Sequence, residues 1–165
     1  AHMRTARNIL LIILALFLQM SWTNAISFWE IKPDLIVLIL VFVGITSGQI
    51  EATILGFFSG FLMDVYNPES MGINALSNSL VGFAVGYSRV GVVAEDIQVQ
   101  ATILFVSCLI HDLIYFICYT FPDPLQGLYL VLRYGLGTAV YTALLGTLIS
   151  LGMMHIFNKR IEPHA

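Results

Sequence analysis

The chain alternates long apolar runs with short polar turns. The first run, residues 9–28, follows Arg4 and Arg7, and it matches the roughly 20 helical residues that cross a hydrocarbon layer. Polar or proline-containing turns separate the later runs, which predict a second helix whose apolar stretch is residues 35–45, and further helices over residues 49–66, 71–90, 97–121 and 129–157. The pattern therefore predicts an all-α integral membrane protein with six transmembrane helices.

The second of these helices is predicted to be short. Pro33 suits a first helical position, and the Asp34 carboxylate favours the positive end of the helix dipole. The apolar stretch ends near Gly44 and Gly48, which leaves about 15 helical residues, or about 22 Å. Because a hydrocarbon layer is about 30 Å thick, this helix either crosses with help from its neighbours or is a re-entrant element.

Small residues recur at helical spacing on three of the predicted helices. In lipid, helices associate largely through close backbone approach at such positions. The stripes are Ala52, Gly56 and Gly60, which lead to Asp64; Gly72, Ala75, Ser79, Gly82 and Gly86; and Gly135, Ala139, Ala143, Gly146 and Ser150. Two stripes contain G-x-x-x-G, which favours packing inside the chain, with dimerisation between copies as the alternative.

One carboxylate lies on a glycine stripe at an unfavourable place. Asp64 is near the carboxyl end of its helix, where a negative charge opposes the helix dipole. We therefore expect polar groups of Asn74, of Ser77 or of the start of the next helix to satisfy the Asp64 carboxylate. It is the best candidate for a polar lock between two helices.

Composition agrees with a membrane protein. Of the 165 residues, 58% are hydrophobic and 10% are charged, whereas about 25% of residues are charged in a soluble domain. The mean hydropathy is +0.88. Residues 3–165 are predicted to form a single six-helix domain, and Ala1-His2 before Met3 is interpreted as a cloning remnant. A net charge of −3 argues against a nucleic-acid partner.

Basic residues predict the orientation of the chain in the membrane. With six crossings, Lys32 lies in a loop on one side, and five basic residues fall on the other: Arg4, Arg7, Arg89, Lys159 and Arg160. Basic segments near membrane helices favour the cytoplasmic side. Both termini are therefore predicted to be cytoplasmic.

Two ionisable residues, Asp112 and Arg133, lie inside predicted helices, where charge is costly. Each lies about ten residues from the Pro122 turn, so the two side chains reach comparable depth. We predict a buried structural ion pair between them, which can include His111. The alternative makes His111 and Asp112 part of a proton path or a metal-dependent active site, but no second cluster at ligand spacing supports it.

The sequence predicts neither a catalytic site nor a cofactor. It contains no G-x-S-x-G nucleophile motif, no P-loop and no H-E-x-x-H zinc motif. Cys108 and Cys118 lie in one helix, about 15 Å apart, which is too far for a disulfide. We interpret both cysteines as buried, inert thiols and expect no bound metal and no enzyme activity.

Three segments resemble the bacterial rod shape-determining protein MreD family. They are PDL at 33–35, GFFSGFLMD at 56–64 and MGINAL at 71–76. The resemblance is strongest from the second to the fourth helix, and the later half matches in hydropathy alone. It implies a non-enzymatic scaffold subunit of the cell-elongation complex in the bacterial plasma (inner) membrane, shaped by Pro33, Asp34, Gly56, Gly60, Asp64, Gly72, Asn74, Gly82 and Gly86.

The resemblance also implies partners. The family is expected to bind MreC and, through it, to help couple MreB filaments to peptidoglycan synthesis by RodA and its transpeptidase, with membrane lipid around the chain and a homo-oligomer as a further option. The family is also similar to S components of energy-coupling-factor transporters. That similarity supplies an S-component-like six-helix fold and an alternative function, vitamin binding for transport. The A-x-x-x-A docking face of S components is absent, because Ala15 is followed by Gln19.

Overall fold

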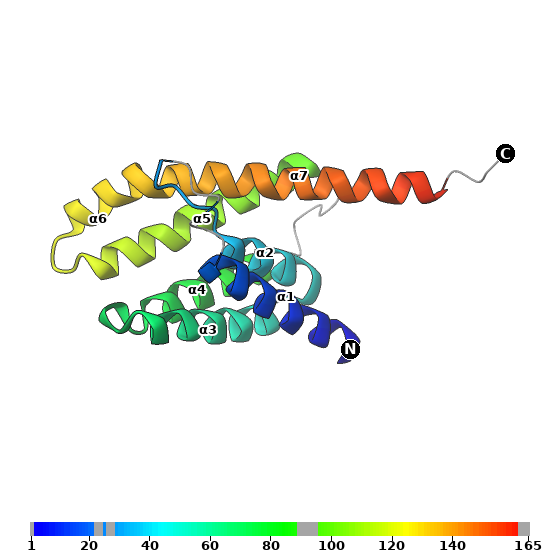
Figure 1. Ribbon diagram of the computed structural model, residues 1–165. Coiled ribbons are helices and arrows are strands. Elements are labelled where there is room, and N and C mark those ends of the chain that lie inside the picture. Colours follow the sequence, from blue (N-terminus) through cyan, green and yellow to red (C-terminus); the bar gives the residue numbers. More distant parts are fainter. Residues whose placement is uncertain (1, 22–24, 26–28, 89–95, 162–165) are drawn as a thin grey trace.

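The computed structural model describes residues 2–21, 25, 29–88 and 96–161, most of which are helical (Figure 1). The elements are α1 (His2–Ser21), α2 (Leu35–Ser47), α3 (Gln49–Tyr66), the 3-10 turn η1 (Pro68–Ser70), α4 (Ile73–Ser88), α5 (Ile97–Tyr119), α6 (Pro124–Leu130), the π-helical segment η3 (Val131–Gly135) and α7 (Leu136–Ile161). Helices α6, η3 and α7 follow one another without a break and make one long rod.

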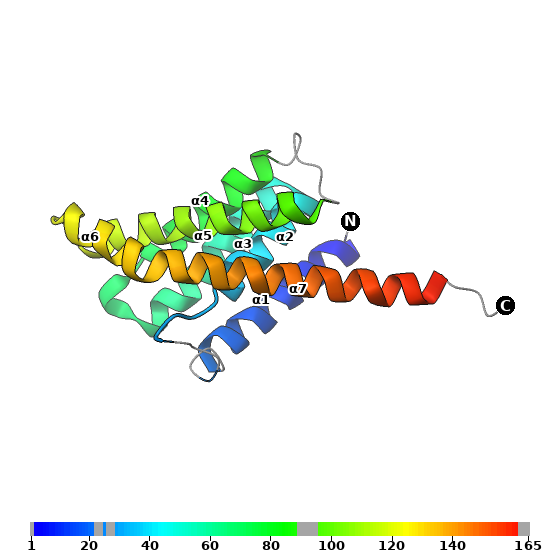
Figure 2. The same cartoon turned by 90° about the horizontal axis from the view of Figure 1, so that it is seen from above.

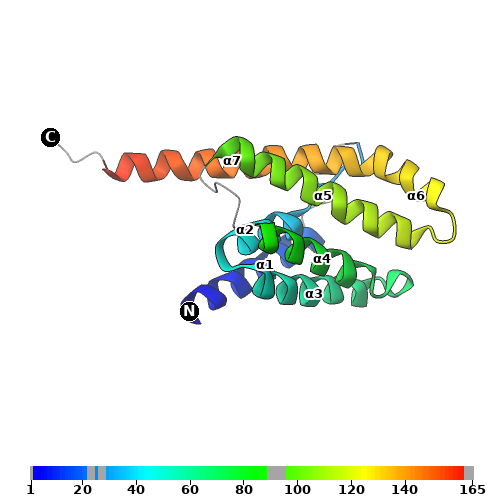
Figure 3. The same cartoon turned by 180° about the vertical axis from the view of Figure 1, so that it is seen from behind.

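The helices are arranged in two layers. Helices α1 to α4 form one layer, and α5 lies beside the α6–α7 rod in the other (Figures 1 and 3). Seen from the side of the rod, α5 and α7 run across the helices of the first layer (Figure 2). Any site between the layers therefore needs residues from both halves of the chain.

Helix α2 is the centre of the bundle. It is apolar all round, which is typical of a helix surrounded by protein, and Val37, Leu40 and Val43 are fully buried. One hydrophobic cluster joins α2 to α4, α5 and α7 through Val37, Val41, Val81, Val85, Leu104, Cys108 and Ala139. A second joins α2 to α1 through Ile12, Ala15, Leu16, Ile36 and Leu40. The short α2 thus holds both layers together.

The predicted helix ends are partly correct. The bounds of α3 and the start of α5 are confirmed, and α2 has 13 residues, as short as expected. The prediction of a first helix over residues 9–28 was wrong, because α1 begins at His2 and Ala25 lies in a turn. The last helix begins at Pro124 rather than near residue 129, because the Asp123 side chain accepts from the N–H groups of its first turn.

Three helices in the described part of the chain are long and apolar enough to cross a membrane. They are His2–Ser21, Ile97–Tyr119 and Pro124–Ile156. Helix α2 is apolar but shorter. The fold is therefore all-α with membrane-spanning capacity, whereas six crossings and an S-component-like bundle stay predictions.

Candidate functional site

Asp64 fixes the connection between α3 and α4. Its carboxylate is fully buried and accepts hydrogen bonds from the N–H groups of Gly72 (3.0 Å), Asn74 (3.1 Å) and Ala75 (3.0 Å), and from the Asn74 amide (3.0 Å). A carboxylate at a helix N-terminus is stabilised by the unpaired N–H groups and the helix dipole. The predicted lock is confirmed for Asn74 and the start of α4. Ser77 instead donates to the carbonyl of Ile73.

Gly72 serves this lock and not the helix packing that the sequence predicted for it. Its φ of +92° lies in the left-handed region, and a side chain added there would meet no atom within 4 Å. Gly72 precedes α4, and its left-handed conformation turns the backbone so that its N–H points at Asp64. Placing Gly72 on the α4 packing stripe was wrong for this reason.

The other glycines of the two G-x-x-x-G motifs pack α3 against α4. A Cβ atom at Gly56 would lie 2.5 Å from the Asn78 carbonyl oxygen, and one at Gly60 would overlap the Asn74 backbone. The α4 glycines Gly82 and Gly86 face the backbones of Ala52 and Gln49 in the same way. Close approach of this kind is what small residues allow in lipid, so packing inside the chain is confirmed for both motifs.

A second polar cluster lies between the two layers and joins Asp34, His111 and Asp112. The Nδ1 atom of His111 is 3.0 Å from Asp112 Oδ1 and 3.5 Å from Asp34 Oδ2. All three residues are buried. The sequence predicted that His111 lies beside Asp112. It did not predict that Asp34, which is far away along the chain, joins them.

Hydrogen bonds to α2 and α7 hold Asp34 in this place. Its Oδ1 atom accepts from the N–H of Val37 (3.0 Å) and caps α2, as the sequence predicted, and the preceding Pro33 is fully buried. Its own N–H donates to the Thr142 hydroxyl on α7 (2.9 Å). Asp34 therefore contacts α2, α5 and α7, and its Oδ2 atom is left to face His111.

The predicted ion pair between Asp112 and Arg133 was wrong. Arg133 is exposed, and its guanidinium lies 5.3 Å from the centre of the Tyr134 ring. The face of the rod that meets Asp112 is that of Gly135, where an added Cβ would lie 3.3 Å from Asp112 Oδ2. Residues two apart on a helix point in nearly opposite directions. Arg133 therefore lies near the depth of Asp112, but its side chain points away from it.

Two further features were not predicted from the sequence. Asn8, which the sequence analysis passed over, is fully buried and donates to Ser47 Oγ (2.8 Å) and Glu51 Oε1 (2.9 Å). It ties α1 to the corner between α2 and α3, and an amide inside an apolar helix was the available signal. Of the two cysteines, Cys108 is buried as predicted, whereas Cys118 is exposed.

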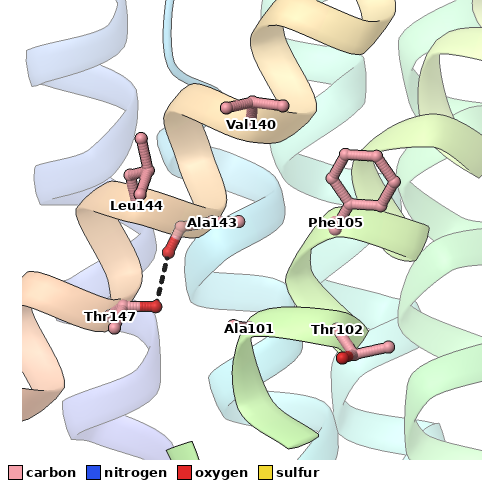
Figure 4. A pocket seen from close by; sticks show the side chains of 7 residues that line it. All are labelled: Ala101, Thr102, Phe105, Val140, Ala143, Leu144 and Thr147. Carbon is pink, nitrogen blue, oxygen red and sulfur yellow. Dashed lines mark hydrogen bonds between the residues drawn. The ribbon is translucent and has the colours of Figure 1, made fainter. Parts of the chain in front are cut away.

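A shallow groove of about 330 Å³ lies between α5 and α7 (Figure 4). It is lined by Ala101, Thr102, Phe105, Val140, Ala143, Leu144 and Thr147. The two threonine hydroxyls donate to carbonyls of their own helices, at Gln98 and Ala143. The lining is therefore apolar in character and suits an acyl chain or an apolar side chain better than a polar small molecule.

Comparison with known proteins gives the chain its family. The family model for rod shape-determining protein MreD matches residues 3–160. The chain belongs to the MreD family. Searches of curated proteins and of solved structures found no match. The MreD match covers nearly the whole chain, so the resemblance seen in α2 to α4 extends through the later half.

Membership in the MreD family has consequences for function. It implies a role in the determination of rod shape, and the family is one of shape-determining proteins rather than a known enzyme family. Together with the three long apolar helices, it indicates a membrane protein. The similarity to S components stays a prediction.

Proposed function

We propose that this MreD-family chain is a non-enzymatic membrane scaffold of the bacterial cell-elongation complex. In this role it binds MreC and helps couple MreB filaments to peptidoglycan synthesis by RodA and its transpeptidase. The observation that carries the proposal is the family match over residues 3–160. The proposed location is the plasma (inner) membrane, with several crossings and both termini in the cytoplasm.

The outer faces of α3 and α4 support a scaffold. Their glycines face inward, so large side chains are left on the outside. Phe57, Phe58 and Phe61 on α3 and Phe83 and Tyr87 on α4 are all exposed. Rings of the same helix contact one another: Phe57 stacks on Phe61 and meets Phe58 edge-on, and Phe83 stacks on Tyr87. Clustered aromatic side chains provide large apolar contact area for lipid or for a partner's helix. We assign the MreC contact to this face.

The proposal gives the small and acidic residues an indirect role. Gly56, Gly60 and Asp64 are buried inside the α3–α4 pair, and Pro33 and Asp34 are buried at the start of α2. Since none of them reaches the outer face, they shape the contact surface by fixing the backbone.

Capture of MreC by variants of the α3–α4 pair tests the proposal. Gly60→Leu separates α3 from α4, because its side chain overlaps the Asn74 backbone, and we expect it to abolish co-purification of MreC from native membranes. Gly152→Leu is the matched control, since a side chain at Gly152 meets no atom within 4 Å. It should capture MreC at the wild-type level.

A surface variant separates loss of the fold from loss of the contact. Phe58→Ala removes an exposed ring, so it should reduce MreC capture and leave the melting temperature of the chain unchanged. Wild-type capture of MreC by Gly60→Leu would contradict the scaffold proposal. Wild-type capture by Phe58→Ala would contradict the assignment to this face.

A further inference from the structure

The Asp34–His111–Asp112 cluster has an unbalanced charge. It contains two carboxylates and one imidazole, so its net charge is −2 with a neutral ring and −1 with a protonated ring. Its three members are buried within the bundle, and in the described part of the structure the ion pairs of the cluster join these members to one another. Because Arg133 is exposed, it does not neutralise them. Uncompensated charge inside a membrane protein is costly.

The atoms that face one another are of types that bind metal ions. Imidazole nitrogen and carboxylate oxygen both bind Zn²⁺, with bonds of about 2.0–2.2 Å in tetrahedral geometry, which places neighbouring ligand atoms about 3.3–3.6 Å apart. The two measured separations from His111 Nδ1 are 3.0 and 3.5 Å. One ligand atom from each residue falls within 4.8 Å of the others. The two separations from His111 therefore lie within about 0.3 Å of the tetrahedral spacing that a single small cation requires.

His111 Nδ1 and Asp112 Oδ1 are hydrogen-bonded to each other, and Asp34 Oδ2 faces the same nitrogen, so a cation that displaces the shared proton would meet all three ligand atoms. Asp34 uses its Oδ1 atom to cap α2, and its Oδ2 atom faces His111. Asp112 Oδ2 lies on the side of Gly135, where an added Cβ would lie 3.3 Å from it, so the carboxylate packs closely against the glycine backbone of the rod. Thr142, which accepts from the Asp34 N–H, fixes the orientation of this residue from α7, as outer-shell hydrogen bonds do around metal ligands.

We propose that Asp34, His111 and Asp112 bind one divalent transition-metal cation of the Zn²⁺ class. Two carboxylates neutralise the charge of a divalent ion, and three protein ligands leave one position for water or another group. Asp34 lies before α2, and the other two ligands lie on α5. The ion therefore joins the two layers of the bundle at the place where α7 also meets them.

Metal content of the purified chain tests this site. The whole chain in detergent is stripped with chelator, incubated with Zn²⁺, dialysed and analysed by mass spectrometry for zinc, and we expect about one ion per chain. Asp34→Asn, His111→Gln and Asp112→Asn should each lower Zn²⁺ affinity more than about tenfold. Co²⁺ in place of Zn²⁺ should give the visible absorption of a tetrahedral site.

Two control variants carry the same types of substitution at residues outside the cluster. Asp123→Asn changes an exposed helix-capping carboxylate, and His155→Gln changes an exposed imidazole on α7; both should retain wild-type zinc. Zn²⁺ should also raise the melting temperature of the wild type and not that of His111→Gln. Wild-type protein that binds no more zinc than the variant with Asp34→Asn, His111→Gln and Asp112→Asn combined would overturn the proposal and indicate that protons neutralise the cluster. Full zinc retention by His111→Gln would overturn it as well.

Discussion

Asp34 and Asp64 are both buried aspartates beside helix N-termini, yet their carboxylates have different surroundings. Asp64 is surrounded by donors from one turn and the following helix, so its negative charge is already satisfied by the backbone. Asp34 receives a single backbone N–H and then faces another carboxylate across His111. The first arrangement stabilises a turn, whereas the second leaves a charge that needs a counterion.

Removal of the Asp64 charge should destabilise the chain. Asp64→Asn keeps the size of the side chain but presents an NH₂ group to N–H donors, so buried hydrogen bonds are lost. Hydrogen bonds to a charged group are worth about 1.5–3 kcal/mol each. We expect a loss of unfolding free energy of at least that size, measured by thermal unfolding in detergent.

Glu69→Gln is the control for this effect. Glu69 is an exposed carboxylate in the adjacent η1 turn, and surface substitutions usually change stability by less than about 0.5 kcal/mol. Equal melting temperatures for Asp64→Asn and the wild type would contradict the role of Asp64 as a lock.

For the helices, the depth of a residue along the helix axis was easier to predict than the direction in which its side chain points. Counting residues from the Pro122 turn placed Asp112 and Arg133 at similar depth. The rod nevertheless presents Gly135 to Asp112 and leaves Arg133 on the surface. Each residue turns a helix by about 100°, so the side of the rod that meets α5 depends on how the two helices pack and not on residue counts.

Helix α4 carries one buried side chain whose amide has no hydrogen bond. Both amide atoms of Asn78 lack a partner in the described part of the structure. Burial of an unsatisfied polar group costs about 1–3 kcal/mol. Asn78→Leu has a similar shape and avoids this cost, so we expect it to raise the melting temperature of the chain.

Asn74→Leu is the matched comparison on the same helix. Since the Asn74 amide donates to Asp64, this substitution should lower the melting temperature. A lower melting temperature for both variants would show that the Asn78 amide has a partner in the membrane-embedded protein.

For the whole molecule, the ends of the helices support the proposed topology. The His2 end of α1 and the Ile161 end of α7 point to the same side, and the α3–α4 and α5–α6 turns lie on the opposite side (Figure 1). This arrangement is what an even number of crossings requires. The basic residues Arg4 and Arg7 accompany the first of these ends.

Fluorescent-protein fusions test the proposed topology. A fusion at either terminus should fluoresce, because the reporter folds in the cytoplasm. Asp123→Cys, in the α5–α6 turn, should react with a membrane-impermeant maleimide in intact spheroplasts, with Cys118→Ser as the background to remove the exposed native thiol. Fluorescence from only one terminus would indicate an odd number of crossings.

The sequence by itself determined the features that act over short distances along the chain. Apolar runs predicted that the chain lies in lipid and located most of its helices, and glycine spacing indicated the α3–α4 packing. The Asp64 lock was also predictable, because its partners lie 8 to 11 residues away. Such contacts follow from helical geometry and a single turn, and both are local properties.

Only the tertiary structure decided the contacts between distant helices. Asp34 meets Thr142 across 108 residues, and Asn8 meets Glu51 across 43. Periodicity tells which face of a helix is apolar, but in lipid nearly every face is apolar, so it does not tell which helices meet. Packing alone brought Asp34 to His111 and Asp112 and turned Arg133 away, since the azimuth of each helix is set by its neighbours.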